Sequence, residues 1–173
     1  MKKIMIALLS LIMSGCTGYP KNITPVKNFD LSRYLGRWYE IARLDHSFER
    51  GLEQVTADYS LRDDSGVSVI NRGFSTTKNE WKEAEGKAYF VREEDEGFLK
   101  VSFFGPFYGS YVIFELEQDY RYAFVSGPNN SYLWFLSRTP SIDDAVKETF
   151  IQRATDLGYP VNELIFVDPV SYT

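Results

Sequence analysis

The sequence is poor in the residues that bind metals or form covalent cross-links. Its 173 residues include one cysteine, Cys16, and one histidine, His46. A disulfide within the chain needs two thiols, and a zinc site needs several convergent ligands. These shortages exclude an internal disulfide and a site built from Cys and His, so no metal is expected. The fold must be held together by its apolar core.

Basic residues are also scarce relative to acidic ones. Lys and Arg total 19 against 24 Asp and Glu, which gives a formal net charge of −5. The chain has no basic stripe, so no nucleic-acid partner is expected. It also has no Gly-rich phosphate loop and no Ser-centred nucleophile motif. We therefore expect neither a cofactor nor an enzymatic activity.

Long apolar runs are limited to one at the N-terminus. Lys2 and Lys3 precede an apolar stretch over residues 4–13, which is too short to span a bilayer as a permanent helix. A positive start followed by a short apolar run is typical of a signal peptide. We expect residues 1–15 to be this signal peptide, and its removal leaves 158 residues, enough for one domain.

The residues around Cys16 indicate a lipid anchor. Ser14 and Gly15 lead into the cysteine in the arrangement of a bacterial lipobox, although Met13 stands where such boxes usually have Leu. Acylation of Cys16 gives an anchor stable enough to keep a protein on a membrane. Thr17 follows instead of the Asp that resembles an inner-membrane retention signal, so we expect the outer membrane, facing the periplasm. A plain secretory signal with an incidental thiol is the alternative.

The rest of the chain divides into a short linker and one folded domain. Residues 16–27 are polar, include Pro20 and Pro25, and are expected to form an acylated tether. Residues 28–173 are expected to form the domain. Within it, apolar residues alternate in short segments separated by turns, which indicates antiparallel strands. The expected strands are a hairpin over residues 55–61 and 67–69, then 38–44, 87–91, 99–104, 111–116, 122–126 and 132–137.

One segment has helical spacing instead. Apolar residues recur three and four apart between Ile142 and Leu157, which predicts an amphipathic helix. Ser141 is its expected N-cap and Gly158 its end. A ninth strand is expected over residues 164–167. The fold class is therefore all-β, an eight-stranded antiparallel up-and-down barrel with a C-terminal helix and a short extra strand, and such a barrel can hold one small ligand.

Three motifs resemble the lipocalin family, namely Gly36-Arg37-Trp38-Tyr39, Asp119-Tyr120 and Leu136-Ser137-Arg138-Thr139-Pro140. Together with the stretches over residues 39–43, 45–46, 48–52 and 100–106, they resemble its bacterial outer-membrane lipoproteins specifically. The resemblance implies that Trp38 plugs the closed end of the barrel and that Arg138 lies across it. It also implies fatty acids or lysophospholipids as ligands and is compatible with a homodimer.

Strict alternation from Trp38 and Arg138 predicts which side chains face the cavity. Ala42 and Leu44 are expected to point inward on the first strand, as are Leu99, Val101, Phe103, Leu136 and Tyr132 on others. The ligand-binding candidates are Glu40, Tyr111, Ile113, Phe124, Ser126 and Trp134. An inward carboxylate is costly unless it is paired. Glu40 is therefore expected either to contact a ligand head group or to pair with a basic side chain near the base.

His46 and the long loop that contains it complete the candidate residues. We expect His46 to help order the loop over residues 45–53, beside the open mouth of the barrel, and not to act in catalysis.

Two functions of the protein remain open. The first is a membrane-anchored protein that stores or transfers lipids, for scavenging or repair of the membrane, because a tethered pocket cannot carry cargo far. The second is a structural envelope lipoprotein with a filled barrel that acts through its outer surface.

Overall fold

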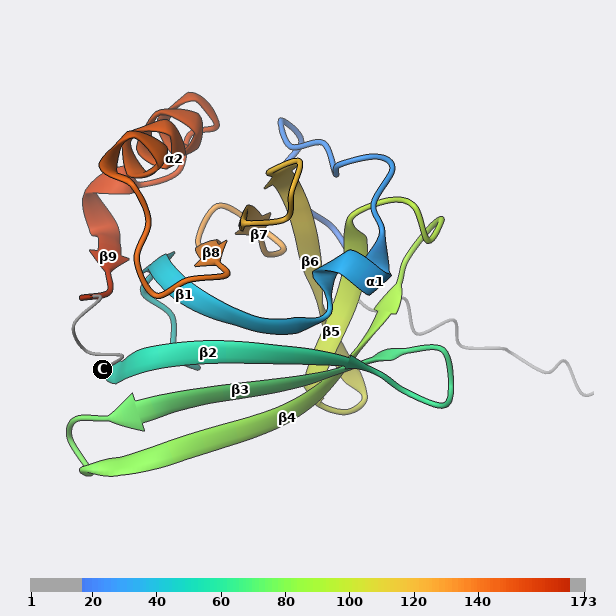
Figure 1. Ribbon diagram of the computed structural model, residues 1–173, viewed down its shortest axis with the longest axis horizontal. Helices are drawn as coiled ribbons and strands as arrows, with labels where there is room; N and C mark the ends of the chain where they lie inside the picture. Colours follow the sequence, from blue (N-terminus) through green and yellow to red (C-terminus); the bar gives the residue numbers. More distant parts are fainter. Residues whose placement is uncertain (1–16, 169–173) are drawn as a thin grey trace, which may run out of the picture.

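The computed structural model describes residues 17–168, whose strands form one nine-stranded antiparallel sheet curved into a barrel (Figure 1). The predicted signal peptide and Cys16 lie outside the described residues. The strands are β1 (Gly36–Leu44), β2 (Leu52–Leu61), β3 (Val67–Ser75), β4 (Glu80–Phe90), β5 (Phe98–Phe104), β6 (Phe107–Leu116), β7 (Tyr122–Ser126), β8 (Leu133–Ser137) and β9 (Leu164–Phe166).

The barrel closes because β1 pairs with both β2 and β8. Every other strand from β2 to β8 pairs with its neighbours in sequence, and β9 adds to β1. The predicted up-and-down barrel with a ninth strand is confirmed. The prediction missed the first half of β4, which begins at Glu80 and not Lys87, because that half is mostly polar and exposed and lacks the alternation typical of a strand.

Two α-helices and a short 3-10 helix, η1 (Val161–Glu163), accompany the sheet within residues 17–168. The short α1 (Leu31–Tyr34) is capped by Asp30, which accepts a hydrogen bond from the Ser32 backbone N–H. The predicted amphipathic helix is α2 (Asp144–Asp156), and Gly158 follows it in the left-handed conformation, with φ of +75°. No helix within residues 17–168 is long and apolar enough to cross a bilayer.

The start of α2 differs from the prediction. Ser141 is not its N-cap, because the helix begins at Asp144 and Asp143 occupies the cap position. The Asp143 side chain makes no capping hydrogen bond. The helix is held mainly by its apolar face, where Phe150 and Ala154 pack against the barrel.

The core has two parts on opposite sides of the barrel wall. One part fills the closed end of the interior and includes Trp38, Ile113 and Val125. The other lies between the wall and α2, where Phe150 packs against Phe124 and Phe135 with ring centroids 4.9 Å apart in both pairs. The helix therefore covers the outer face of the wall and does not enter the barrel.

Register shifts overturn part of the predicted alternation. β1 shifts between Glu40 and Ala42, so that Ala42 and Leu44 join the core under α2 although they were expected to face the interior. A bulge adds one residue to a strand and thereby reverses the faces that follow it. Arg43 is consequently the side chain that turns toward the Glu40 carboxylate.

The predicted inward direction of Phe124 and Ser126 is also wrong. Phe124 packs under α2, and the Ser126 hydroxyl accepts a hydrogen bond of 2.7 Å from Tyr159. Their neighbours Ala123 and Val125 face the barrel interior instead. β7 has five residues and apolar side chains on both faces, so its sequence does not indicate which of its side chains face the barrel interior.

Residues 18–27 of the expected tether, which spans residues 16–27, are bound to the barrel. Ile23 is buried, and the Asn22 side chain donates to the Leu157 carbonyl at 2.7 Å. The Val26 N–H donates to the Ile113 carbonyl at 2.9 Å. This segment is fixed along the outside of the barrel, so it offers little of the reach expected from its prolines.

Candidate ligand-binding site

The closed end of the barrel is formed around Trp38. Its indole is fully buried, and its Nε1 donates to the Tyr34 carbonyl at 2.8 Å. The Arg138 guanidinium lies 4.0 Å from the centre of the indole ring and donates to the carbonyls of Arg37 and Arg33 at 2.9 and 2.7 Å. This stacking combines a cation–π contact with hydrogen bonds that fix the arginine.

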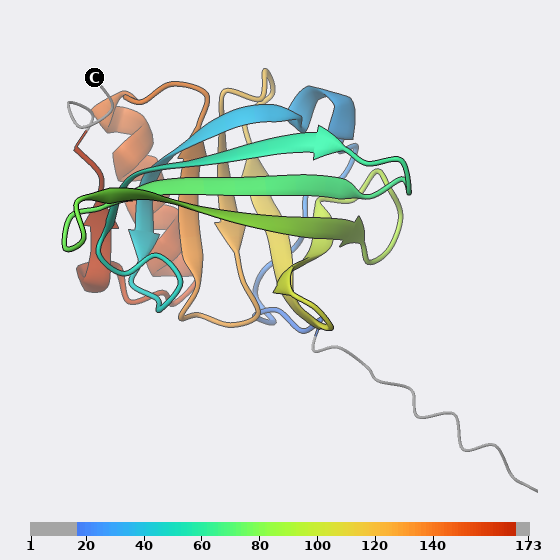
Figure 2. The ribbon, with the colours of Figure 1, turned by 90° about the horizontal axis from the view of Figure 1, so that it is seen from below.

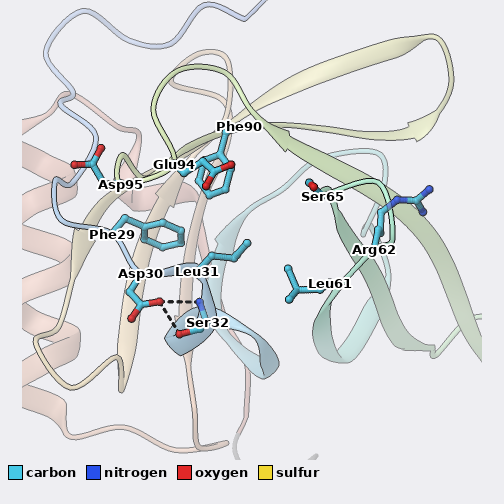
Figure 3. Close-up of a pocket in the computed structure, with 10 residues that line it drawn as sticks. All are labelled: Phe29, Asp30, Leu31, Ser32, Leu61, Arg62, Ser65, Phe90, Glu94 and Asp95. Atoms are coloured by element: carbon cyan, nitrogen blue, oxygen red, sulfur yellow. Dashed lines mark hydrogen bonds between the residues drawn. The ribbon is translucent and has the colours of Figure 1, made fainter.

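A hollow of about 570 Å³ lies outside this end, between α1 and the β2–β3 turn. Figure 3 shows Leu31 and Leu61 facing each other across it, while the Arg62 guanidinium points away. Two of its polar side chains already have partners, since Asp30 accepts from Ser32 and Arg62 pairs with Asp64. The hollow is open to solvent on one side and offers no enclosed volume.

The barrel interior holds a cavity of about 670 Å³, which is within the range of small-molecule sites. Its wall is mostly apolar. Apart from single polar side chains such as Thr56, Asn71 and Ser102, its polar groups form two clusters at different levels. The apolar and aromatic lining includes Leu31, Val55, Ala57, Val67, Val69, Ala88, Leu99, Val101, Phe103 and Leu136. Such a lining suits an acyl chain and gives little to a sugar or a nucleotide.

Three tyrosines form the deeper polar level. The Tyr111 hydroxyl lies 2.8 Å from that of Tyr34 and 2.9 Å from that of Tyr59. Burial raises the pKa of all three phenols, so they stay protonated at neutral pH. Three hydroxyls carry three protons, and two mutual hydrogen bonds use two of them. One proton can therefore be donated to a ligand.

Four ionisable side chains form the second level, where the loop after β1 covers the cavity. Glu40, Arg43, His46 and Glu49 are all buried. Arg43 pairs with the Glu40 carboxylate and donates to the carbonyls of Glu49 and Leu52 at 3.2 and 3.0 Å. Trp134 Nε1 donates to the Glu49 carboxylate at 3.3 Å. We call these four side chains and Trp134 the mouth cluster.

The two carboxyl groups of the mouth cluster have opposite pKa shifts. Burial raises the pKa of Glu40 well above its usual range, and the nearby Glu49 charge raises it further, although Arg43 opposes both. Burial also acts on Glu49, but His46, Glu40 and Arg43 outweigh it and hold its pKa below the usual range. Burial therefore favours the protonated form of Glu40, whereas its neighbours favour the ionised form of Glu49.

His46 joins the loop to the barrel wall. Its Nε2 lies 3.2 Å from the Glu49 carboxylate, without the alignment of a hydrogen bond, and its ring packs edge-on against Trp134 at 5.1 Å. The expected role in ordering the loop fits these contacts. Within residues 17–168, no three His, Cys, Asp or Glu side chains are grouped to hold a metal ion.

The candidates from the sequence divide into three groups. Glu40, Tyr111 and Trp134 line the cavity. Ile113 faces the interior but is fully buried in the packed closed end. Phe124 and Ser126 lie outside the wall, as described above. For Glu40, the structure shows the paired state, with Arg43 toward the mouth and not near the base as expected.

Sequence reasoning missed four residues that shape the site. Arg43 and Glu49 belong to the mouth cluster, and Tyr34 and Tyr59 complete the tyrosine level. Tyr59 alternates with Ala57 in the predicted hairpin, so its inward direction was available from the sequence. Arg43 was not accessible in this way, because only the β1 register shift brings it inward.

Comparisons with known proteins agree with this architecture. The family model for the lipocalin-like domain matches residues 29–169. The chain is 58% identical over 168 residues to a Vibrio cholerae protein named outer membrane lipoprotein Blc, covering 96% of this chain and 98% of that protein. It is 55% identical to the Escherichia coli K12 protein of the same name over 148 residues, which is 86% of this chain and 84% of that one.

Solved structures show the same fold at low identity. Insecticyanin from the tobacco hornworm Manduca sexta superposes with a TM-score of 0.69 at 22% identity, over 87% of this chain and 86% of that one. The barrel topology, the Trp38–Arg138 stack at its closed end and these matches agree. The chain belongs to the lipocalin family.

Proposed function

We propose that this protein is a bacterial outer-membrane lipoprotein that binds a fatty acid or a lysophospholipid in its barrel. The anchor is acylated Cys16, and the domain faces the periplasm. The observation that carries the proposal is the cavity of about 670 Å³, with an apolar wall and two separate polar levels. An amphiphile with one acyl chain fits this distribution of polar and apolar surface. The relatives named outer membrane lipoprotein support the location.

The cavity also argues against a filled, purely structural barrel. Phe103, Tyr111 and Trp134 are bulky enough to fill a small barrel, but they line the cavity wall and leave the central volume open. A protein that acted only through its outer surface would gain stability from closing this space. We therefore favour ligand binding over the structural alternative.

We do not propose catalysis. Glu40 and Glu49 are the buried carboxyl pair of the cavity, and an acid–base role would require them to be free to exchange protons with a substrate. Glu40 is instead paired with Arg43, and Glu49 accepts from Trp134. Their contacts suit a loop fixed over the cavity. Holding lipids near the bilayer fits retrieval or repair of membrane lipids, because anchoring limits how far cargo can travel.

The first test is extraction of the protein's own cargo. We expect mass spectrometry of organic extracts to find free fatty acids or lysophospholipids at near-stoichiometric amounts, in protein carrying Cys16→Ser and purified without detergent. A matched barrel protein from the same cells controls for contaminating lipid. Repeated preparations without any acyl compound above that control would contradict the proposal.

The second test locates the cargo. Trp134→Ala removes an indole from the cavity wall, and we expect it to weaken binding of a fluorescent fatty acid about tenfold. Trp81→Ala is the control, because Trp81 lies outside the barrel and is 46% exposed. Equal affinities for the two variants would place binding elsewhere.

A further inference from the structure

Three phenylalanines around the cavity opening are unusually exposed. The exposed fractions are 67% for Phe48, 71% for Phe104 and 75% for Phe107. All three also line the cavity. Exposed apolar side chains that gather around one opening mark an interaction surface, whereas scattered ones need no explanation. We call these three residues the mouth phenylalanines.

The mouth phenylalanines come from two loops at the same end of the barrel. Phe48 lies in the loop between β1 and β2, and Phe104 pairs with Phe107 across the β5–β6 hairpin. Leu61, which is 62% exposed, provides a contrast, because it lies at the other end of β2, beside α1 and the closed end.

The start of the described chain lies beside the same hairpin. The Gly18 carbonyl accepts a hydrogen bond of 2.6 Å from Ser110, which follows Phe107 on β6. The next residue, Tyr19, packs edge-on against Phe98 at the start of β5, with ring centroids 5.0 Å apart, so the chain runs from the hairpin side toward the closed end. In Figure 2 the blue beginning of the described chain runs close to the yellow hairpin.

This placement limits how an anchored barrel can be oriented. Cys16 precedes Gly18 by two residues, which span at most about 7 Å when extended. The segment after Gly18 cannot lengthen this reach, because residues 18–27 are bonded along the barrel wall. An acyl anchor at Cys16 therefore holds the β5–β6 side of the mouth within a short distance of the bilayer surface.

We propose that the mouth of the barrel rests on the membrane, with the mouth phenylalanines in the interfacial region of the bilayer. Aromatic side chains favour this region, and apolar burial adds to the anchoring by the acyl chains. An acyl chain then passes between bilayer and cavity without crossing water. This inference rests on acylation of Cys16, and its last step also rests on the proposed function.

The test measures depth at two exposed positions of the acylated, full-length protein in vesicles of phosphatidylethanolamine and phosphatidylglycerol. Acylation consumes Cys16, the chain's single cysteine, so Phe107→Cys or Leu61→Cys each supply one site for an environment-sensitive dye. We expect the dye at position 107 to be quenched several-fold more strongly by lipids with a nitroxide on the upper acyl chain. The dye at position 61 should remain open to aqueous iodide.

Equal access of iodide to both dyes would overturn the proposal. So would protection of the position 107 dye in vesicle-free solution of the Cys16→Ser protein, because a second copy would then cover the mouth. Fatty-acid titration of the same labelled proteins separates this inference from the proposed function. Binding without membrane insertion contradicts only the orientation, and insertion without binding contradicts only the function.

Discussion

The two ends of the barrel differ in how fully their buried polar groups are hydrogen-bonded. At the closed end, Trp38 Nε1 and the Arg138 guanidinium both donate to backbone carbonyls. At the mouth, Arg43 Nε and both ring nitrogens of His46 have no hydrogen-bond partner among residues 17–168. Unsatisfied buried groups cost free energy. The closed end is therefore arranged for stability, whereas the mouth keeps desolvated charge beside the cavity at a cost to stability.

The largest expected effect is the loss of the closed end. Trp38→Ala removes a fully buried indole, its hydrogen bond to Tyr34 and the surface on which Arg138 stacks. We expect the free energy of unfolding to fall by about 3–5 kcal/mol, measured by urea denaturation. If that variant does not fold, Trp38→Phe applies the same test with a smaller cavity.

Trp81→Ala is the control for this prediction, because Trp81 is half-exposed outside the barrel. Its loss should cost less than about 1 kcal/mol. Similar losses for the two tryptophans would remove the distinction between a stabilising closed end and the rest of the barrel.

Next in size is the mouth cluster. Arg43→Met leaves the Glu40 and Glu49 carboxyl groups buried without their cation, and we expect it to cost about 3 kcal/mol in the free energy of unfolding. Arg50→Met in the same loop breaks an exposed pair with Asp45 and should cost less than about 1 kcal/mol. A cost for Arg43→Met as small as that of the control would mean that the cluster is hydrated and holds no buried charge.

The third prediction concerns pH and Glu40. Because the folded protein raises the pKa of Glu40, the stability linked to this group is fully present below the unfolded pKa, about 4.3. It is lost as pH rises through the folded pKa. Glu40→Gln cannot titrate, so its free energy of unfolding should decline less between about pH 5 and pH 8. Near pH 5 the substitution should cost less than about 1 kcal/mol, because it replaces one neutral group by another.

Glu49→Gln is the matched variant, and Glu49 contributes to the pH dependence of stability with the opposite sign. The folded protein lowers the pKa of Glu49, so this carboxylate contributes stability above its unfolded pKa and loses it as pH falls. Thermal unfolding across the pH series should separate the two variants. Parallel curves for wild type and Glu40→Gln would show that Glu40 is ionised in the folded state.

The closed end was also the more predictable of the two from the sequence. Period-two alternation located the strands, and the contact between Trp38 and Arg138 was implied by the resemblance of two motifs to the lipocalin family. These signals depend on local pattern and on strand order, both of which a sequence carries. The helix was found for the same reason, from the spacing of residues such as Phe150 and Ala154.

The mouth was less predictable because its contacts depend on register and on a loop. A shift in β1 turned Arg43 inward and Ala42 outward, and strict alternation cannot detect such a shift. Glu49 reaches the cavity only because the loop after β1 folds back over it. Polar composition and two prolines predict a tether over residues 16–27, whereas the bonds that fix residues 18–27 involve residues distant in sequence, such as Ser110.

The smallest expected effect on stability is at the mouth phenylalanines. Phe104→Ser combined with Phe107→Ser removes side chains that are mostly exposed, so the free energy of unfolding of the Cys16→Ser protein should change by less than about 0.5 kcal/mol. Leu61→Ser at the closed end should change the free energy of unfolding equally little, as measured by urea denaturation. The two changes should differ in vesicle flotation of this same Cys16→Ser protein, which has no acyl anchor, because only the double phenylalanine variant loses the side chains that enter the bilayer. A substantial loss of stability from that variant would mean that the hairpin is packed in solution, and exposure would no longer distinguish the mouth from the closed end.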